Sequence, residues 1–363
     1  MTTESVIASY VDAHHAEQID FLRQIVRVPS DTPPGNNNPP AEKAAALLRA
    51  KGYVVERFAV PDDRVRDYGM VSVTNLIVRH TFGSGGPTIA LNAHGDVVPP
   101  GDGWSFDPYG GEVKDGRMYG RGVAVSKSDI ASFTFALDAL QAAEKAGAIL
   151  NGSVELHFTY DEEFGGLLGP DYLLEIKATK PDYVIGASFS YAIVTAHNGC
   201  LQFEVTVHGT ATHGSMPETG DDALQAANAI LNAIYGKLPD LGKIKSKVAG
   251  INTPTMLVGQ INGGTNTNVV PGKVVLKLDR RMIPEENPVE VEATIRRVIA
   301  DAAATVSGIT IEIKRLLMAS AWKPDTRNAE LVQTLQKHGE QVFGEPIPTS
   351  GTPLYTDVRL FGA

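Results

Sequence analysis

The spacing of apolar residues changes repeatedly between a helical and a strand period along the first half of the chain. Apolar side chains recur at helical spacing over residues 11–28, and an Ala- and Leu-rich segment at 41–50 predicts a second helix that ends before Gly52. The other elements predicted in this half are short buried strands at 74–79, 88–93 and 153–160 and a long helix at 130–146. This alternation predicts an α/β fold, a layered mixed sheet with helices on both faces.

A different pattern begins near Asn198. The elements predicted from there on are, in order, a strand at 201–207, a helix at 221–235, strands at 255–261 and 273–279, a helix at 288–304 and a strand at 309–313. The order βαββαβ is that of the ferredoxin-like arrangement, in which four strands bury one face against two helices. We therefore predict an α+β domain over residues 198–315, inserted into an α/β domain that consists of residues 1–197 and 316–363. A last helix, at 329–342, belongs to the α/β domain in this scheme.

Composition and charge narrow the class of protein. The 363 residues, 43% of them hydrophobic and 20% charged, are enough for two domains that each bury a core. No run of 18 apolar residues occurs and residues 1–20 lack the apolar stretch of a signal peptide, so we expect a cytoplasmic protein that does not span a membrane. The single cysteine, Cys200, excludes an internal disulfide and is expected to be a small buried residue in a strand. A net charge of −10 without any block of Lys or Arg argues against nucleic acid or an anionic membrane as a partner.

Candidate chemistry lies where two of the predicted strands end. His94 ends one buried strand, and Asp96 two residues later points to the same side, as in a metal-binding imidazole that is oriented by a carboxylate. Glu162 and Glu163 follow another strand and point to different sides, so that one can bind a metal ion while the other faces a water molecule. Taken singly, the first pair is also compatible with a hydrogen-bonded turn and the second with a solvated acidic turn.

The segments around these residues resemble a known family. Residues 94–99 (His-Gly-Asp-Val-Val-Pro), 101–104 (Gly-Asp-Gly-Trp) and 115–122 (Asp-Gly-Arg-Met-Tyr-Gly-Arg-Gly), followed by Lys127, resemble the M20 family of zinc-dependent amidases and exopeptidases. The segment 209–217 is similar to the family's Gly-x-x-x-His-x-x-x-Pro loop, and 262–271 is similar to its Asn-Gly-Gly-x-x-x-Asn-Val-Val-Pro segment. The resemblance extends over nearly the whole chain.

The resemblance implies a role for each matching residue. It implies that Glu162 is the general base, that Glu163 and His94 bind metal, and that Asp96 supports His94. His213, supplied by the inserted domain and in the family usually by the partner subunit, would stabilise the oxyanion that forms at the scissile carbonyl. Arg281 and Asn268 would hold a carboxylate of the substrate, a task that suits a planar guanidinium because it can hold both oxygens at once. The family's inserted domain further implies a lid and a homodimer that forms through it.

Three of the family's ligand positions differ in this chain. Val125 stands where the family has an Asp that bridges two metal ions, and Ala187 or Ser188 stands where the next carboxylate would be. The family's last ligand, a histidine, would follow the end of the chain at Ala363, so we expect a C-terminal truncation. One interpretation is a single ion held by His94, Glu163 and Asp129; the other interpretation of Asp129 is a carboxylate favoured by a helix N-terminus.

The predicted function is therefore metal-assisted hydrolysis of an amide bond in a small, carboxylate-bearing substrate, of the N-acyl amino acid deacylase or exopeptidase type. The expected cofactor is one divalent ion per chain, zinc in the first place, with cobalt or manganese as alternatives. The alternative is a catalytically altered member of the family that binds a small carboxylate ligand without hydrolysing it, which Val125 and Ala187 favour.

Overall fold

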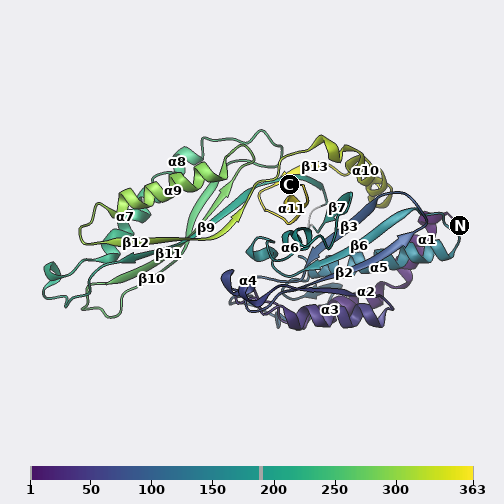
Figure 1. Ribbon diagram of the computed structural model, residues 1–363, viewed down its shortest axis with the longest axis horizontal. Helices are drawn as coiled ribbons and strands as arrows, with labels where there is room; N and C mark the ends of the chain where they lie inside the picture. Colours follow the sequence, from purple (N-terminus) through teal and green to yellow (C-terminus); the bar gives the residue numbers. More distant parts are fainter. Residues whose placement is uncertain (1, 188–190, 363) are drawn as a thin grey trace. The chain divides into compact units, whose positions relative to one another are not determined.

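The computed structural model describes residues 2–187 and 191–362, and the chain forms two compact units. The first unit consists of Met1–Ser190 and Thr356–Ala363, and the second of Tyr191–Tyr355 (Figure 1). These limits differ from the predicted ones, because residues 191–197 and 316–355 cluster with the second unit and not with the first. The units are described one at a time.

The first unit is built on a mixed five-stranded sheet in the order β1-β2-β6-β3-β7. Its strands are β1 (Glu56–Ala59), β2 (Thr74–Phe82), β3 (Thr88–His94), β6 (Gly152–Thr159) and β7 (Tyr183–Gly186). Strand β6 pairs antiparallel with β2 and parallel with β3, and β3 pairs parallel with β7. The predicted layered α/β fold is confirmed, and each of the three predicted strands begins and ends within three residues of the observed strand.

Helices cover both faces of this sheet. The helices of the first unit are α1 (Thr3–Ala13), α2 (His15–Val26), α3 (Asn38–Ala50), α4 (Asp62–Asp67), α5 (Lys127–Lys145), α6 (Pro170–Glu175) and α11 (Val358–Phe361). In Figure 1, α2 and α3 lie on one side of the strands and α6 and α11 on the other. The single helix predicted at 11–28 is in fact two helices, because the chain leaves the helical conformation at His14.

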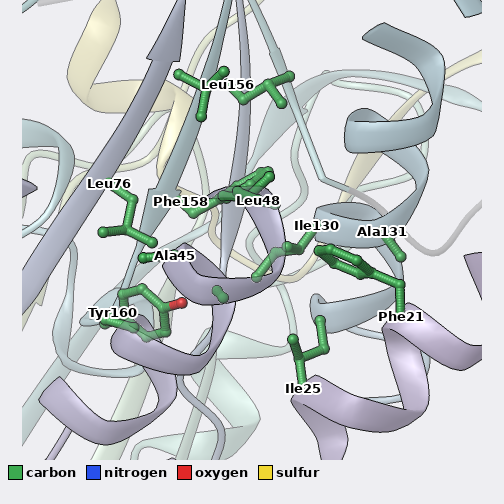
Figure 2. Close-up of a cluster of buried hydrophobic side chains, with 14 of the residues drawn as sticks. Phe21, Ile25, Ala45, Leu48, Leu76, Ile130, Ala131, Leu156, Phe158 and Tyr160 are labelled. Atoms are coloured by element: carbon green, nitrogen blue, oxygen red, sulfur yellow. The ribbon is translucent and has the colours of Figure 1, made fainter. Parts of the chain in front are cut away.

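The face of the sheet that packs against α3 and α5 is apolar. Every second residue of β6 points to this face. Leu156 and Phe158 are fully buried there and pack with Leu48 of α3 and Ile130 of α5 (Figure 2). The residues that alternate with these two along β6, Glu155, His157 and Thr159, point to the opposite face. On that face the ring of His157 stacks on Phe361 of α11, with ring centroids 6.0 Å apart. The apolar face therefore anchors the sheet, while polar side chains on the other face lead toward the ends of the strands.

The pairing of β3 with β6 sets the position of the site. The two strands run parallel, and His94 lies opposite Thr159, so both end at the same edge of the sheet. The chain crosses closely there, since a Cβ atom on Gly95 would lie only 2.3 Å from the ring of Tyr160. Glycine at this position therefore lets the two loops that follow the strands approach each other.

The second unit has the predicted βαββαβ order. Its elements are β9 (Gly199–His208), α7 (Ala223–Tyr235), β10 (Thr255–Gly263), β11 (Lys273–Met282), α9 (Pro288–Ala303) and β12 (Thr310–Ala319). The sheet order is β10-β11-β9-β12 with antiparallel pairs throughout, and α7 and α9 share its core. Smaller elements of this unit are α8 (Leu238–Leu241), α10 (Ala329–Phe343) and a parallel pair of β8 (Ile193–His197) with β13 (Thr349–Thr352).

The strand β12 is longer than predicted, which explains part of the difference in domain limits. It pairs with β9 as far as Ala319 opposite Cys200, although the prediction ended at residue 313. A register shift between Arg315 and Leu317 interrupts the alternation of apolar and polar residues, and that alternation is the signal on which a strand prediction depends. The buried position of Cys200 in a strand agrees with its predicted structural role.

Replacing Phe158 with alanine tests the apolar face of the first unit. The side chain is fully buried, so Phe158→Ala should lower the free energy of unfolding by about 3–5 kcal/mol through lost burial and a residual cavity. Urea-induced unfolding followed by far-UV circular dichroism measures the change. As a control, Ile149→Ala removes a side chain that is 91% exposed and should change the value by less than about 0.5 kcal/mol. A loss below 1 kcal/mol for Phe158→Ala would contradict the described packing.

Candidate metal and catalytic site

Three side chains converge at the common end of β3 and β6. His94 is the last residue of β3, and Glu162 and Glu163 begin the short 3-10 helix η1 (Glu162–Phe164) two residues after β6. One ligand atom from each lies within 4.8 Å of the other two, and His94 Nε2 is 3.9 Å from Glu162 Oε2. All three side chains are largely withdrawn from solvent. An imidazole nitrogen and two carboxylates are the donors that zinc takes in proteins, so these residues fit one divalent cation.

Asp96 holds this arrangement together. Its carboxylate is fully buried, and Oδ1 lies 3.3 Å from His94 Nδ1. The backbone N–H groups of Glu162 and Glu163 donate to Oδ1 and Oδ2 of the same carboxylate, at 3.3 and 3.1 Å. Because Nδ1 of His94 faces both the carboxylate and the backbone oxygen of Asp96, Nε2 is left to act as the ligand atom.

The electrostatics of the group favour a cation. Burial lowers the pKa of His94, but the carboxylates of Glu162, Asp96 and Glu163 outweigh it and raise the pKa well above its usual value. Burial raises the pKa of both Glu162 and Glu163, although His94 opposes the shift in each case. Several carboxylates thus compete for few protons in a buried space. A divalent ion would displace those protons and replace their stabilising effect.

Two further carboxylates, Asp161 and Asp357, lie close behind the site and were not predicted from the sequence. Both are almost completely buried; burial raises the pKa of Asp161, and the carboxylate of Asp357 adds to the rise in the pKa of both Asp161 and Glu162. Asp161 accepts a hydrogen bond from the backbone N–H of Leu168 at 2.5 Å. Asp357, which is hydrogen-bonded to the side chain of Thr159, has its pKa raised to about 6 by burial, against the opposing charge of Arg359. Asp161 adjoins the glutamate pair in the sequence, whereas no local signal marks Asp357, which comes from the far end of the chain.

Asp129 is not a member of the three-residue group among the described residues. It lies in the first turn of α5, and its carboxylate is hydrogen-bonded to Ser126 and Ser128. Burial raises its pKa to about 6, and the charge of His94 opposes that shift, so the two residues interact at a distance. Its role as a metal ligand stays a prediction.

The positions that depart from the family pattern offer no ligand atoms where they can be described. Val125 is partly buried just before α5. Ala187 packs against the apolar core, and its backbone N–H donates to the oxygen of Asn92. Ser188 lies outside the described residues. Neither hydrocarbon side chain can replace a carboxylate.

His213 and Asn268 lie together in the second unit. His213 Nε2 is 3.5 Å from Asn268 Nδ2, and residue 213 forms a β-bridge with Val269. The backbone N–H of Ser215 donates to His213 Nδ1 at 3.2 Å, and the Ser215 hydroxyl lies 2.8 Å from the same atom. Because Nδ1 accepts a hydrogen bond, the neutral ring carries its proton on Nε2. His213 can therefore donate a hydrogen bond from that atom.

Arg281 is partly exposed on β11 and is paired within its own strand. Its Nε donates to Asp279 Oδ1 at 2.8 Å, and its guanidinium lies 5.7 Å from the centre of the Tyr355 ring. The Asp279 carboxylate also accepts from Gln202 at 2.9 Å. The pairing occupies one edge of the guanidinium, and the side chain remains 28% exposed.

Comparison with known proteins identifies the family of this chain. Residues 90–363 match the family model of peptidase family M20/M25/M40. The chain belongs to this family. The predicted resemblance is thus confirmed, and with it a metallohydrolase that acts on amide bonds and uses a divalent metal ion.

Relatives of this M20 protein are similar over most of their length. The succinyl-diaminopimelate desuccinylase of Parvibaculum lavamentivorans is 29% identical over 361 residues, which cover 96% of this chain and 85% of that protein. Human carnosine dipeptidase 1 has the same fold, with a TM-score of 0.78 at 19% identity over 99% of this chain and 90% of that chain. The M20 metallo-carboxypeptidase Sso-CP2 of Sulfolobus solfataricus superposes with a TM-score of 0.73 at 18% identity, over 96% and 88% of the two chains. Within the described residues of the M20 chain, every helix is too short or too polar to cross a membrane.

The raised pKa of Asp357 predicts how stability depends on pH. A carboxyl group whose pKa rises to about 6 on folding stabilises the folded state only while it is protonated, so its contribution is lost as the pH rises from about 4 through 6. For Asp357, a rise in pKa from about 4 to about 6 corresponds to about 3 kcal/mol. In chelator-treated protein, the free energy of unfolding of Asp357→Asn relative to the parent should therefore be about 3 kcal/mol higher at pH 7 than at pH 4. Urea unfolding at the two pH values measures this difference.

A control with the opposite sign is available in the same chain. The hydrogen bond from Arg327 lowers the pKa of Asp325, so the stability of Asp325→Asn relative to the parent should fall as the pH rises toward about 4 and should change little above that. A difference between Asp357→Asn and the parent that stays constant from pH 4 to 7 would contradict the raised pKa of Asp357.

Proposed function

We propose that this chain hydrolyses the amide bond of a small, carboxylate-bearing substrate, an N-acyl amino acid or a short peptide. The convergence of His94, Glu162 and Glu163 on one buried point carries the proposal, because it supplies ligands and a base within a single site. The names of the relatives, a desuccinylase of a diamino acid and dipeptidases, support this substrate class. We assign one ion per chain, zinc in the first place and cobalt or manganese as alternatives, to His94 and Glu163.

The chain's own residues can carry out the proton transfers. A bound divalent ion would polarise the scissile carbonyl and acidify a water molecule. Glu162 accepts the proton of that water and passes it to the leaving nitrogen. Its buried setting, which raises the pKa of the carboxyl group, makes Glu162 an effective carrier of that proton. Asp96 keeps His94 and the backbone of both glutamates in place throughout.

Residues of the second unit have proposed roles as well. We assign oxyanion stabilisation to His213, whose Nε2–H is free to donate because Ser215 occupies Nδ1. Asn268 beside it, and Arg281, would hold the substrate's carboxylate. In this proposal the protein works in the cytoplasm, which suits its single buried cysteine.

A second candidate function is ligand binding without hydrolysis. Val125 and Ala187 favour it, since two positions that hold carboxylates elsewhere in the family carry hydrocarbon here. Titration with N-acyl amino acids in the presence and absence of a chelator separates the two functions. Hydrolysis that the chelator abolishes supports the enzyme, and chelator-insensitive binding without turnover supports the binding protein.

The two neighbouring glutamates provide a matched pair of variants. Glu162→Gln should lower kcat by a factor of about 10²–10⁴ or more, as expected for loss of a general base, while the metal content stays at one ion per chain. Glu163→Gln should lower the metal content itself, because a ligand is lost. Elemental analysis after dialysis against zinc, cobalt or manganese, together with turnover of N-acyl amino acids, measures both effects.

The opposite pattern would overturn the assignment of roles. Loss of metal from Glu162→Gln with retention in Glu163→Gln would make Glu162 the ligand. Two ions per chain in the parent protein would refute the single-ion site, and unchanged turnover in Glu162→Gln would refute the mechanism.

We also propose that the chain forms a homodimer through the second unit. Strand β10 lies at the edge of its sheet, where Leu257 and Ile261 are about half exposed. On α7, Leu224 and Tyr235 are 47% and 44% exposed. An unpaired edge strand with apolar side chains is a surface that pairs readily with another strand. A second copy of the same edge would satisfy it with twofold symmetry.

Charged residues on the edge strand test this dimer. The double variant Leu257→Lys/Ile261→Lys should convert a particle of twice 38.7 kDa into a monomer, because lysines on an edge strand oppose pairing. Sedimentation velocity gives the mass. Val54→Lys is the control, since this residue is 84% exposed and belongs to the first unit. A parent protein that is monomeric at micromolar concentration, or a double variant that stays dimeric, would contradict the proposal.

A further inference from the structure

Arg121 belongs to the segment 115–122 that resembles the family, and the mechanism proposed above gives it no task. It follows the short strand β5 (Arg117–Tyr119), and its side chain is half-buried. Its Nη2 atom donates to the backbone oxygens of Pro99 and Pro100, at 3.4 and 3.1 Å. These bonds fix the guanidinium against the loop that leaves the metal site.

Trp104 restrains the same guanidinium. The Cζ atom of Arg121 lies 5.3 Å from the centre of the indole ring, and the indole N–H donates to the oxygen of Pro100 at 2.8 Å. The two side chains therefore share one acceptor and are also held together by a cation–π contact. A guanidinium restrained in this way loses little conformational entropy when it binds a ligand.

The guanidinium lies next to the metal ligand Glu163. The Glu163 carboxylate accepts the backbone N–H of Val98, and Arg121 binds the oxygens of the two residues that follow. The two side chains thus hold adjoining points of one short segment. Burial raises the pKa of Glu163, and the charges of His94 and Arg121 oppose that rise. Arg121 therefore adds a positive charge beside the metal site, within the first unit.

Most of the donors of Arg121 are not used by the protein. A guanidinium carries five N–H donors, and both bonds to the proline oxygens come from Nη2. In the part of the chain that the structure describes, Arg121 forms no salt bridge, Nη1 makes no hydrogen bond, and Nε is buried without an acceptor. Val98 and Trp104 beside it are 42% and 38% exposed, so a solute can reach this surface. A half-buried cation with unused donors favours the approach of an anion.

We propose that Arg121 binds a second carboxylate of the substrate, in addition to the carboxylate that we assign to Arg281. The inference rests on the proposed function, because it narrows the substrate class of the same site to dianions. An amide with an acidic acyl group or an acidic side chain belongs to this class. The planar guanidinium suits a carboxylate because it can donate to both oxygens at once, and its partial burial strengthens these bonds relative to bulk water.

Dicarboxylates and their monoamides test this binding on the full chain after dialysis against zinc. Succinate and glutarate are compared with succinamate and glutaramate, which have the same shape and one carboxylate fewer. Each monoamide retains a carboxylate for the metal ion, so the ratio of the two dissociation constants isolates the second carboxylate. At least one dicarboxylate should bind about tenfold or more tightly than its monoamide, as expected for a charge-assisted hydrogen bond.

Tryptophan fluorine signals measure these dissociation constants. The chain has two tryptophans, so labelling with 5-fluorotryptophan gives two ¹⁹F resonances, which Trp322→Phe assigns. The resonance of Trp104, which contacts Arg121, should shift and saturate with the dicarboxylate. The resonance of Trp322, which belongs to the second unit, is the internal control.

A matched pair of variants separates Arg121 from a general effect of charge. Arg121→Met removes the donors but keeps an apolar stem, so the ratio of dissociation constants should fall to about one. Arg117→Met removes the same charge from an exposed position on β5 and should leave the ratio unchanged. A purely structural role of Arg121 would weaken dicarboxylate and monoamide alike and would not alter the ratio.

The outcomes distinguish this inference from the proposed function. A ratio near one for both pairs of probes in the parent, or a high ratio that Arg121→Met retains, would overturn the inference. Hydrolysis is measured separately, with N-succinyl-L-alanine and N-acetyl-L-alanine. Hydrolysis with a ratio near one refutes the inference alone, whereas a high ratio without hydrolysis of any amide refutes the proposed function and supports the dicarboxylate site.

Discussion

The carboxylate of Asp96 is the element on which the rest of the site depends. One buried group contacts the imidazole of His94 and accepts the backbone N–H groups of Glu162 and Glu163. Asp96 therefore fixes both the orientation of the His94 imidazole and the path of the loop that carries Glu162 and Glu163. Without this contact, the two loops would share a sheet edge but their side chains would have no common orientation.

The site places like charges close together in a dry environment, at a cost to the folded protein. Glu162, Glu163, Asp161 and Asp357 all have raised pKa values, which means that their ionised forms are destabilised by burial. Such a cluster persists because the apolar face around Leu156 and Phe158 stabilises the sheet from the other side. The destabilised carboxylates are in turn ready to receive a cation, so the binding of metal and the stability of the first unit are linked.

The second unit uses its sheet differently on its two surfaces. One side packs α7 and α9 into a core, and the edge strand β10 carries apolar residues toward solvent. The loop with His213 and Asn268 is held by backbone contacts rather than by burial. A unit of this design can offer a donor, a carboxylate clamp and an assembly surface from separate elements.

The sequence by itself determined the fold class, the βαββαβ order and the family, because these follow from periodicity and from motifs whose residues are close together in the chain. His94 with Asp96, and Glu162 with Glu163, were found in this way. Only the tertiary structure decided that the two motifs meet, since that depends on the parallel pairing of β3 with β6. Only the tertiary structure shows that Asp357 lies beside Thr159 and that Asp129 is not part of the three-residue group of His94, Glu162 and Glu163. No pattern in the neighbouring sequence indicates either arrangement. The tertiary structure also moved the limit of the second unit to Tyr191, since the irregular β12 and the parallel pair of β8 and β13 join segments that periodicity cannot connect.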